Sequence, residues 1–472
     1  MNTIYYCPES SMLIPTNGGT IPVGAFLTGA PNTHEYGQEY YAVSGTYAPT
    51  IQHHHHPLQQ TIHSGMLSDF EYNSLMAQMN RLTLSGSGRG QMPEWLFDEE
   101  GNFTVSLQDI VELDLFFICV RDKKGSQFIQ DNFPAENCPL RRKLYDMLFD
   151  SQSIYNLAMD MFGNFVIQKM ITEAGKEFGQ KMLHLLSVQA PDMAFNRFSC
   201  RVIQKAIDAF SADMLEPMLQ AFRGYVLSMG TEQSANYLYN ILYWHPTNHP
   251  SKDYRFVVEE MCSPGNMDKM ICNKFGCRVV QFCLEKLTKN YDGDLMKDDC
   301  IEASLVRTLM EKITRKAFRY SQDEFANYIV QYVIKHRALN VYRDRIIKSA
   351  LVGNILSLSQ SKYSSHVVEQ AFECAPDNLL PEMVNEVFHG KVNPKNGRDS
   401  LDQMLFDQYG NYVIQRLLNM AIQIRHGKRQ GKAKWFELLS QRICINVQPL
   451  LKYSSGKKII ETVSAEVGYP LV

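Results

Sequence analysis

The sequence lacks the segments that would place it in a membrane or direct it out of the cell. No apolar run approaches the ~20 residues that an α-helix needs to span a bilayer. The first residues, MNTIYYCPESS, contain no basic region followed by an apolar stretch, so they do not resemble a secretory signal. We therefore expect a cytoplasmic protein without a membrane-spanning segment.

The eleven cysteines do not form a recognisable metal or disulfide framework. There is no CxxC pair, and Cys272, Cys277 and Cys283 lack zinc-ligand spacing and histidines at ligand intervals. An odd count scattered among apolar residues favours reduced thiols in a cytosolic helical core. His53 to His56 are an alternative metal site, but their setting, IQHHHHPLQQ, is typical of a polar low-complexity tract. We expect no metal and no cofactor.

Catalytic signatures and a strong positive charge are also missing. No Ser-His-Asp, HExxH or P-loop pattern is present, so we do not expect an enzyme. SGSGRG (85–90) follows no strand and lacks the GK[ST] ending of a phosphate loop, which favours a linker. The formal charge is −3, and residues 1–100 hold two basic and nine acidic residues. The other 372 residues hold 45 basic and 41 acidic ones, so any anion-binding surface must come from local clustering.

Two regions differ in composition. Residues 1–95 are rich in Gly, Pro, Ser, Thr, Gln and Tyr and poor in Lys and Arg, which predicts a disordered low-complexity region. Within it, residues 68–83 have helical spacing and are a candidate short helix or partner motif. Residues 96–472 form the second domain, and their pattern is helical from about residue 104 onward.

That second domain repeats one phrase. YSSHVVEQA (363–371) recurs as FGNFVIQKM (162–170), FSCRVIQKA (198–206), FGCRVVQFC (275–283), FANYIVQYV (325–333) and YGNYVIQRL (409–417). Eight copies, which we number repeats 1 to 8, follow one another at intervals of 38, 36, 36, 41, 50, 38 and 46 residues. A period near 36 is typical of a helical solenoid, in which stacked repeats supply the core that one repeat cannot form alone. A ninth, altered copy, SSGKKIIETV (454–463), is expected to cap the exposed end.

Three positions of the phrase vary together on one helix face. Positions i and i+4 of an α-helix lie about one turn apart on the same side, so Asn411 and Gln415 point the same way. Tyr412 is displaced by about 100° and projects between neighbouring repeats. Val413 and Ile414 turn inward to the core. We call the three surface positions the first edge, flat and second edge positions.

The members of these positions can be listed for the eight repeats in order. The first edge residues are Ser126, Asn164, Cys200, Asn236, Cys277, Asn327, Ser365 and Asn411. The flat residues are Gln127, Phe165, Arg201, Tyr237, Arg278, Tyr328, His366 and Tyr412. The second edge residues are Gln130, Gln168, Gln204, Asn240, Gln281, Gln331, Glu369 and Gln415.

Such a set suits an unpaired nucleobase. Amides and a carboxylate match the donors and acceptors on a base edge, while aromatic and guanidinium groups match its flat face. Bases in a duplex hide their pairing edges, so a single-stranded ligand is expected. For one copy, a polar helix face in a plain repeat scaffold is the better explanation of NxxxQ. Eight copies in register, in which the edge residues vary while the core residues stay apolar, favour recognition of nucleobases.

The repeats resemble those of the Pumilio-type (PUF) family of RNA-binding proteins over residues 104–472. This resemblance implies an all-α, right-handed curved α-solenoid of eight three-helix repeats with terminal capping segments. It implies a monomer that binds single-stranded mRNA 3′ untranslated regions, recruits protein corepressors and represses translation or promotes decay. It also implies that the RNA runs antiparallel to the protein, so that repeat 8 recognises the first base.

The edge residues then predict a sequence. Asparagine with glutamine donates and accepts, as uracil requires, and a small residue with glutamine leaves room for adenine. Guanine presents two adjacent donors, which the two oxygens of Glu369 can accept with charge-assisted bonds. The predicted site is 5′-UGUA-n-AUA-3′. Its undefined fifth base faces repeat 4, where Asn240 is one methylene shorter than glutamine and should discriminate weakly, with a mild preference for uracil. An extra central base is left open.

Two alternatives remain at this point. An armadillo or HEAT-like solenoid would bind proteins instead of RNA, but would not require a single glutamate in place of glutamine.

Insertions at 287–303 and 386–403 lengthen two connections. The polar, turn-rich HGKVNPKNGRDS (389–400) is either a solvated loop or, as the resemblance suggests, a docking loop for protein partners on the convex side.

Overall fold

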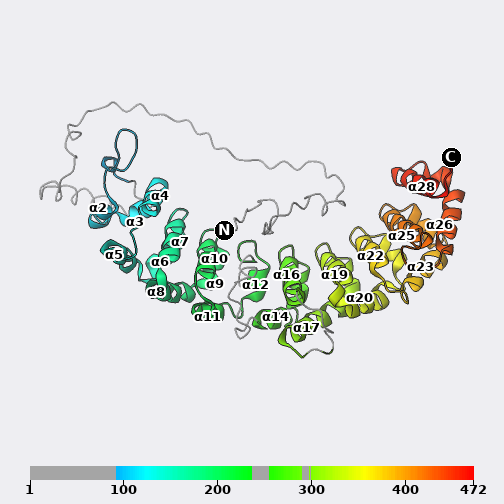
Figure 1. Ribbon diagram of the computed structural model, residues 1–472, viewed down its shortest axis with the longest axis horizontal. Coiled ribbons are helices and arrows are strands. Elements are labelled where there is room, and N and C mark those ends of the chain that lie inside the picture. The colour runs from blue at the N-terminus through cyan, green and yellow to red at the C-terminus, as the bar shows by residue number, and fades with distance from the viewer. Residues whose placement is uncertain (1–91, 237–254, 290–296, 298, 472) are drawn as a thin grey trace. The chain divides into compact units, whose positions relative to one another are not determined.

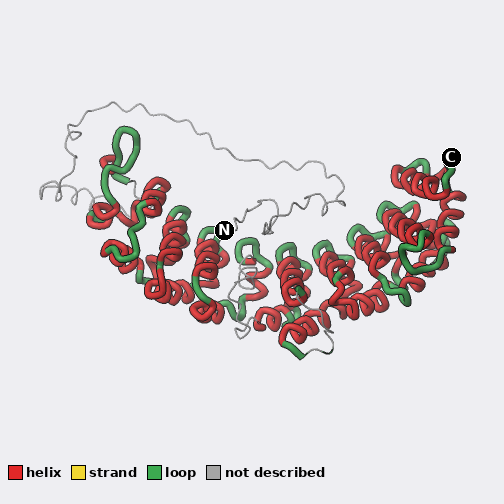
Figure 2. The backbone as a smooth tube through the Cα atoms, in the orientation of Figure 1, coloured by secondary structure: helices red, strands yellow, loops and turns green. Residues whose placement is uncertain are grey.

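The computed structural model describes residues 92–236, 255–289, 297 and 299–471, all within one compact unit, Met66–Val472. In these residues β-pairing is confined to a single antiparallel bridge between Phe97 and Phe103, and the rest is helix and loop (Figure 2). The predicted all-α class is confirmed. The predictions for residues 1–91, including the helix at 68–83 and His53 to His56, lie outside the described residues.

Most repeats consist of three helices. The described elements of repeats 1 to 4 are η2 (Glu94–Leu96), α2 (Leu107–Glu112), α3 (Phe116–Val120), α4 (Lys123–Asp131), α5 (Pro139–Leu148), α6 (Ser151–Ala158), α7 (Gly163–Glu173), α8 (Gly175–Val188), α9 (Ala190–Phe195), α10 (Ser199–Ala209), α11 (Ala212–Ala221) and α12 (Val226–Gly230). Those of repeats 5 to 7 are α14 (Arg255–Met261), α15 (Asn266–Ile271), α16 (Gly276–Thr288), α17 (Ile301–Arg315), α18 (Ala317–Ser321), α19 (Ala326–Lys335), η3 (Arg337–Leu339), α20 (Asn340–Ile346), the π-helix η4 (Ile347–Leu351), α21 (Ile355–Ser359) and α22 (Ser364–Cys374). Repeat 8 and the cap comprise α23 (Leu380–His389), α24 (Ser400–Leu405), α25 (Gly410–Arg425), α26 (Lys434–Ile445), α27 (Val447–Leu450) and α28 (Ser454–Val467).

Among the described helices, the third helices of successive repeats pack on one another. These contacts join α4 to α7, α7 to α10, α16 to α19, α19 to α22, α22 to α25 and α25 to α28. The first helices form a second row, in which α8 packs on α11, α14 on α17 and α17 on α20. Within the Met66–Val472 unit, the third helices follow the inner side of the curve and the first helices its outer side (Figure 1). The predicted solenoid is therefore confirmed, and α28, the altered ninth copy, ends its inner row.

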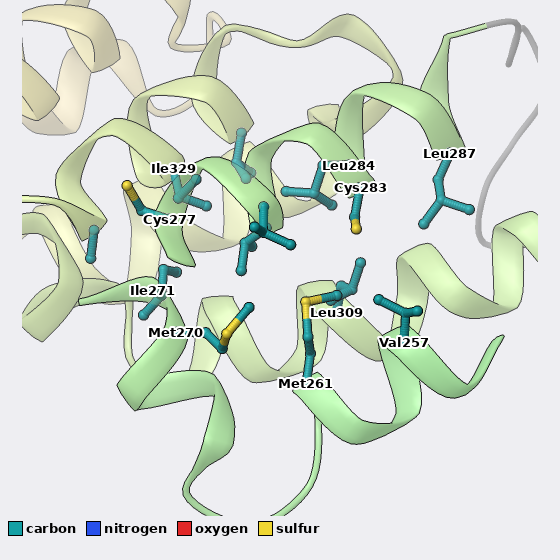
Figure 3. Packing of buried hydrophobic residues seen from close by; sticks show 14 of the residues in the cluster. Val257, Met261, Met270, Ile271, Cys277, Cys283, Leu284, Leu287, Leu309 and Ile329 are labelled. Atoms are coloured by element: carbon teal, nitrogen blue, oxygen red, sulfur yellow. The ribbon is translucent and has the colours of Figure 1, made fainter. Parts of the chain in front are cut away.

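One continuous hydrophobic cluster runs from Leu96 to Val463 through the described repeats. In repeat 5, Cys283 and Leu284 of α16 pack in the layer that also contains Met261 of α14 and Leu309 of α17 (Figure 3). The predicted inward positions of the phrase are buried in repeats 2, 3 and 5 to 8, as Val413 and Ile414 illustrate, whereas in repeat 1 Ile129 is buried and Phe128 is half-buried. Burial of this cluster is the main stabilising term, because each repeat completes the apolar face of its neighbour.

A polar side chain fixes the start of most third helices. In repeat 2, Asp160 Oδ1 accepts hydrogen bonds from the backbone N–H groups of Phe162 and Gly163, both at 2.8 Å. The same position, four residues before the first edge residue, acts in the same way in other repeats through Asp122, Asn196, Glu232, Asn273, Asp323 and Asp407. These bonds satisfy N–H groups that a helix start leaves unpaired. They set where the first edge, flat and second edge positions begin, and we call these three together the recognition positions.

The residue before the first edge position lies against the end of the second helix, where little space remains. A Cβ on Gly163 would lie 2.7 Å from the backbone oxygen of Leu157. In repeats 3 and 7 a serine occupies this position, and Ser199 and Ser364 each donate to the carbonyl six residues earlier, at 2.7 Å. Only small residues, or serine with its hydroxyl paired, fit this crossing.

We expect Gly163→Val to destabilise the protein by about 1–3 kcal/mol, because an overfilled crossing forces α6 and α7 apart. The measurement is the urea unfolding midpoint, followed by far-UV circular dichroism. Ala326→Ser is the matched control, since serine already occupies this position in two repeats, and it should leave the midpoint nearly unchanged. A Gly163→Val midpoint equal to that of the wild type would contradict the packing argument.

The two insertions are shorter than predicted. Helix α16 continues to Thr288 and α17 begins at Ile301, and residues 290–296 and 298 between them lie outside the described part. Helix α23 continues to His389 and α24 begins at Ser400, so the loop predicted at 386–403 comprises 390–399. The apolar spacing of Met383, Val384 and Val387, all buried, explains why the helix extends into that segment.

None of the helices in the described part of the chain is long and apolar enough to cross a bilayer.

Candidate nucleic-acid interface

The first edge side chains are buried in seven repeats and half-buried in repeat 4, and all eight share one hydrogen-bond pattern. In each of the eight repeats, the side chain donates to the backbone carbonyl three residues earlier. For example, Ser126 Oγ donates to Lys123 O at 3.1 Å and Asn327 Nδ2 donates to Glu324 O at 2.8 Å. The other members of the set are Asn164, Cys200, Asn236, Cys277, Ser365 and Asn411. The carbonyl holds each donor, so the remaining acceptor capacity is what the side chain presents to a ligand.

In repeats 2, 6 and 8 the two edge residues are hydrogen-bonded to each other. Gln168 Nε2 donates to Asn164 Oδ1 at 2.9 Å, and the same bond joins Gln331 to Asn327 at 2.8 Å and Gln415 to Asn411 at 3.0 Å. The prediction that these residues share one face is confirmed. Each asparagine Nδ2 already bonds two backbone carbonyls, so the free donor of the pair must come from glutamine.

In repeats 3 and 5 the first edge residue is a cysteine whose thiol stays protonated at neutral pH. Burial raises the pKa of Cys277 to about 11, and burial also raises the pKa of Cys200. Their second edge partners point differently. Gln204 Oε1 accepts from Arg201 Nη1 at 3.0 Å, whereas Gln281 Nε2 donates to Glu285 at 2.8 Å. The small thiol leaves more room beside the second edge glutamine than asparagine does.

Repeat 1 differs from both groups. Gln130 Nε2 donates to the backbone oxygen of Ser126 at 3.1 Å. The glutamine amide therefore bonds the backbone of the first edge residue and not its side chain. The flat residue Gln127 is exposed and donates to Asp131 at 2.9 Å.

Repeat 7 carries the one carboxylate among the eight second edge positions. Glu369 Oε1 lies 3.4 Å from His366 Nδ1, and Glu369 Oε2 lies 4.0 Å from Arg416 Nη2 of repeat 8. The glutamate side chain is 17% exposed, so it is accessible at the surface of α22 while most of it is covered. The two oxygens therefore lie toward nitrogen atoms of two different side chains, one on each side of the carboxylate.

The flat residues of the seven fully described repeats are exposed, unlike their first edge neighbours. Phe165, Tyr328 and Tyr412 expose 51%, 60% and 50% of their surface. Gln127, Arg201, Arg278 and His366 are also exposed. Large aromatic side chains are costly to leave in water, so three of them exposed at the same helical position indicate a surface that a ligand covers.

Repeat 4 is only partly described. Asn236 is half-buried, and its Nδ2 donates to Glu232 O and Gln233 O at 2.6 and 2.7 Å. Tyr237 and Asn240, the other two predicted members, lie outside the described residues.

Sequence reasoning missed Arg416 and the polar residues that start the third helices. Arg416 directly follows the second edge residue of repeat 8, and its charge is opposite to that of Glu369. The capping residues had a visible signal as well, since Asp or Asn stands four residues before the first edge position in most repeats.

Other candidate sites lie elsewhere or have no support in the described residues. A groove of about 680 Å³ is lined by residues of α8 and of the start of α11, and it contains none of the recognition positions. Within residues 92–236, 255–289 and 299–471, no group of His, Cys, Asp or Glu side chains is arranged to hold a metal ion.

Comparisons with known proteins identify what this arrangement is similar to. The NOP9-like PUF repeat domain matches residues 102–373, and the Pumilio-family RNA-binding repeat matches residues 404–421. Pumilio domain-containing protein 5 of Caenorhabditis elegans is 34% identical over 389 residues, which cover 79% of this chain and 69% of that protein. Fem-3 mRNA-binding factor 2 of the same organism is 32% identical over 401 residues, covering 79% of this chain but only 63% of the relative. The crystal structure of PUF-6 in complex with 5BE13 RNA superposes with a TM-score of 0.69 at 30% identity, covering 76% of this chain and all of that one.

Proposed function

Because the chain belongs to the Pumilio (PUF) family of RNA-binding repeat proteins, we propose that it binds single-stranded RNA sequence-specifically and recognises about one base with each repeat. The observation that carries this proposal is the row of third helices. Each fully described repeat presents two adjacent hydrogen-bonding residues beside an exposed flat one. An unpaired base offers a polar edge and a flat face in the same relative arrangement.

The proposed target is 5′-UGUA-n-AUA-3′, with its first base at repeat 8. The Asn/Gln pairs of repeats 8, 6 and 2 would bind uracil, since the asparagine oxygen accepts from N3–H and the glutamine amide donates to a carbonyl oxygen. Glu369 with Ser365 would bind guanine through N1–H and N2–H₂. Cys277, Cys200 and Ser126 with their glutamines would leave room for adenine. The fifth base faces repeat 4, where we expect weak selection.

Direct binding tests this function against the protein-binding solenoid that the repeats alone would permit. Fluorescence anisotropy with labelled UGUAUAUA should give a dissociation constant well below that for the same RNA annealed to its complement. A protein-binding solenoid of the armadillo or HEAT kind would bind neither RNA. Equal binding of the single strand and the duplex would contradict recognition of base edges.

We further propose that the protein regulates mRNA in the cytoplasm without catalysing a reaction. Support comes from the relative named Fem-3 mRNA-binding factor 2 and from the absence of a catalytic motif in the sequence. In this proposal the chain acts as a monomer, binds 3′ untranslated regions and recruits protein corepressors that repress translation or promote decay. Reporter mRNAs that differ only in the UGUA element test it, since repression should require that element.

The corepressor surface would include the loop 390–399, which has internal order. Asn393 N donates to Arg398 O at 2.8 Å, and Gln403 Nε2 donates to Lys391 O at 3.3 Å and to Arg398 O at 3.1 Å. Val392 is nevertheless 59% exposed. A loop that is held in one conformation and exposes an apolar side chain fits a docking element better than a bare solvated connection does.

Deleting residues 391–398 should weaken corepressor binding while leaving RNA affinity within about twofold, because the loop contributes none of the recognition positions. Asp399 stays in place, so its ion pair with Arg442 and its cap on α24 are retained. Co-precipitation of corepressors and anisotropy with UGUAUAUA are the two measurements. Unchanged co-precipitation would assign the loop a purely connecting role.

A further inference from the structure

The guanidinium of Arg416 lies between two carboxylates of the preceding repeat. Its Nη2 is 4.0 Å from Glu369 Oε2, and its Nη1 is 3.6 Å from Glu373 Oε2. Glu369 and Glu373 are one turn apart on α22, and Arg416 comes from α25, which packs directly against α22. A charge from repeat 8 thus reaches the residue that we assign to the second base.

This contact is specific to repeat 7 because of the residue that follows the second edge position in the neighbouring repeat. The residue after the second edge position is Asp131, Lys169, Lys205, Ile241, Phe282, Tyr332, Gln370 and Arg416 in the eight repeats. Arginine occurs there once, in the repeat that packs on the only second edge carboxylate of the eight. Lys169, at the same position in repeat 2, instead pairs with Glu173 of its own helix at 3.0 Å.

A carboxylate at this place has an electrostatic cost that the amides do not have. RNA carries a negative charge at every phosphate, so an uncompensated glutamate on the binding face would repel the strand. The carboxylate must also be oriented so that both oxygens accept from the two N–H groups of guanine. A neighbouring guanidinium serves both requirements, since its charge offsets the repulsion between carboxylate and phosphate and its N–H groups can orient the two oxygens.

We propose that Arg416 is a positioning residue for guanine selection, holding the carboxylate of Glu369 oriented for the base. The inference rests on the proposed function, since it concerns the assignment of the second base. Arg416 need not touch the base itself. It acts through Glu369, and its second partner, Glu373, fixes the guanidinium from the other side.

The test compares the affinities of UGUAUAUA and UAUAUAUA for Arg416 variants of the full chain. Arg416→Gln should lower the ratio of guanine over adenine by about two- to fivefold, the range for one partly exposed ion pair. Arg416→Lys, which keeps the charge, should restore most of that ratio. Lys169→Gln is the matched control at the same position of repeat 2, and it should leave the ratio unchanged.

A second background separates positioning from a contact with phosphate. In a Glu369→Gln protein, Arg416→Gln should no longer alter the ratio, because the group through which it acts is gone. An equal loss of affinity for both RNAs, or a fall in the ratio that persists in the Glu369→Gln background, would overturn the inference. If the wild-type protein does not prefer guanine at all, the base assignment in the proposed function fails before Arg416 is tested.

Discussion

Replacing Glu369 with glutamine should remove the preference for guanine at the second base and leave the other positions unchanged. Guanine presents two donors side by side, and glutamine offers them only one acceptor, with its amide N–H directed against a guanine N–H. An unpaired or opposed polar group at a covered site costs about 1–3 kcal/mol, or about 5- to 150-fold in affinity. Competition between UGUAUAUA and UAUAUAUA for the variant and the wild type measures the effect.

Gln130→Glu in repeat 1 is the reciprocal experiment. Repeat 1 has a serine at its first edge position, as repeat 7 does, so the change places the Ser/Glu pair of repeat 7 at the other end of the row. The variant should prefer guanine over adenine at the eighth base, with the second base unaffected. A Glu369→Gln protein that still selects guanine would show that the carboxylate is not the recognition group.

Replacing Tyr328 with alanine should weaken binding of every RNA sequence by a similar factor. Its ring is 60% exposed and stands at the flat position of repeat 6. Stacking of a base on an aromatic ring contributes about 1–3 kcal/mol, so a loss of about 5- to 150-fold is expected. The loss should be the same for UGUAUAUA and UAUAUAUA, because stacking does not distinguish the base at a different repeat.

Tyr328→Phe is the control, since it retains the ring and removes only the hydroxyl. It should bind within about twofold of the wild type if the flat face is what matters. An alanine variant with full affinity would mean that the exposed ring faces solvent in the complex as well, and the flat positions would then have no part in binding.

The sequence was sufficient to predict the repeats and the shared face because both depend on local periodicity. Asn411 and Gln415 are four residues apart, so one helix is enough to bring them together, and Val413 and Ile414 must then turn to the core. The replacement of glutamine by glutamate at the second edge position of repeat 7, Glu369, was visible for the same reason. These features need no information about how one repeat meets the next.

Features that depend on contacts between backbone segments or between repeats were not predicted. The donors of Asn164, Asn327 and Asn411 are held by carbonyls of the preceding turn, a constraint that the composition of the phrase does not reveal. The proximity of Arg416 to Glu369 depends on the packing of α25 against α22. The position at which α23 ends was also not predicted. The helix continues to His389 because its apolar residues are buried, and the polar, turn-rich segment follows it directly.

Selection from a random RNA pool with the full chain tests the central claim most directly, because it assumes no target. One base for each repeat, bound antiparallel, predicts enrichment of a UGUA element followed by one variable base and AUA. Enrichment of the reversed order, of a motif without guanine at the second base, or of duplex-forming RNAs would contradict that claim.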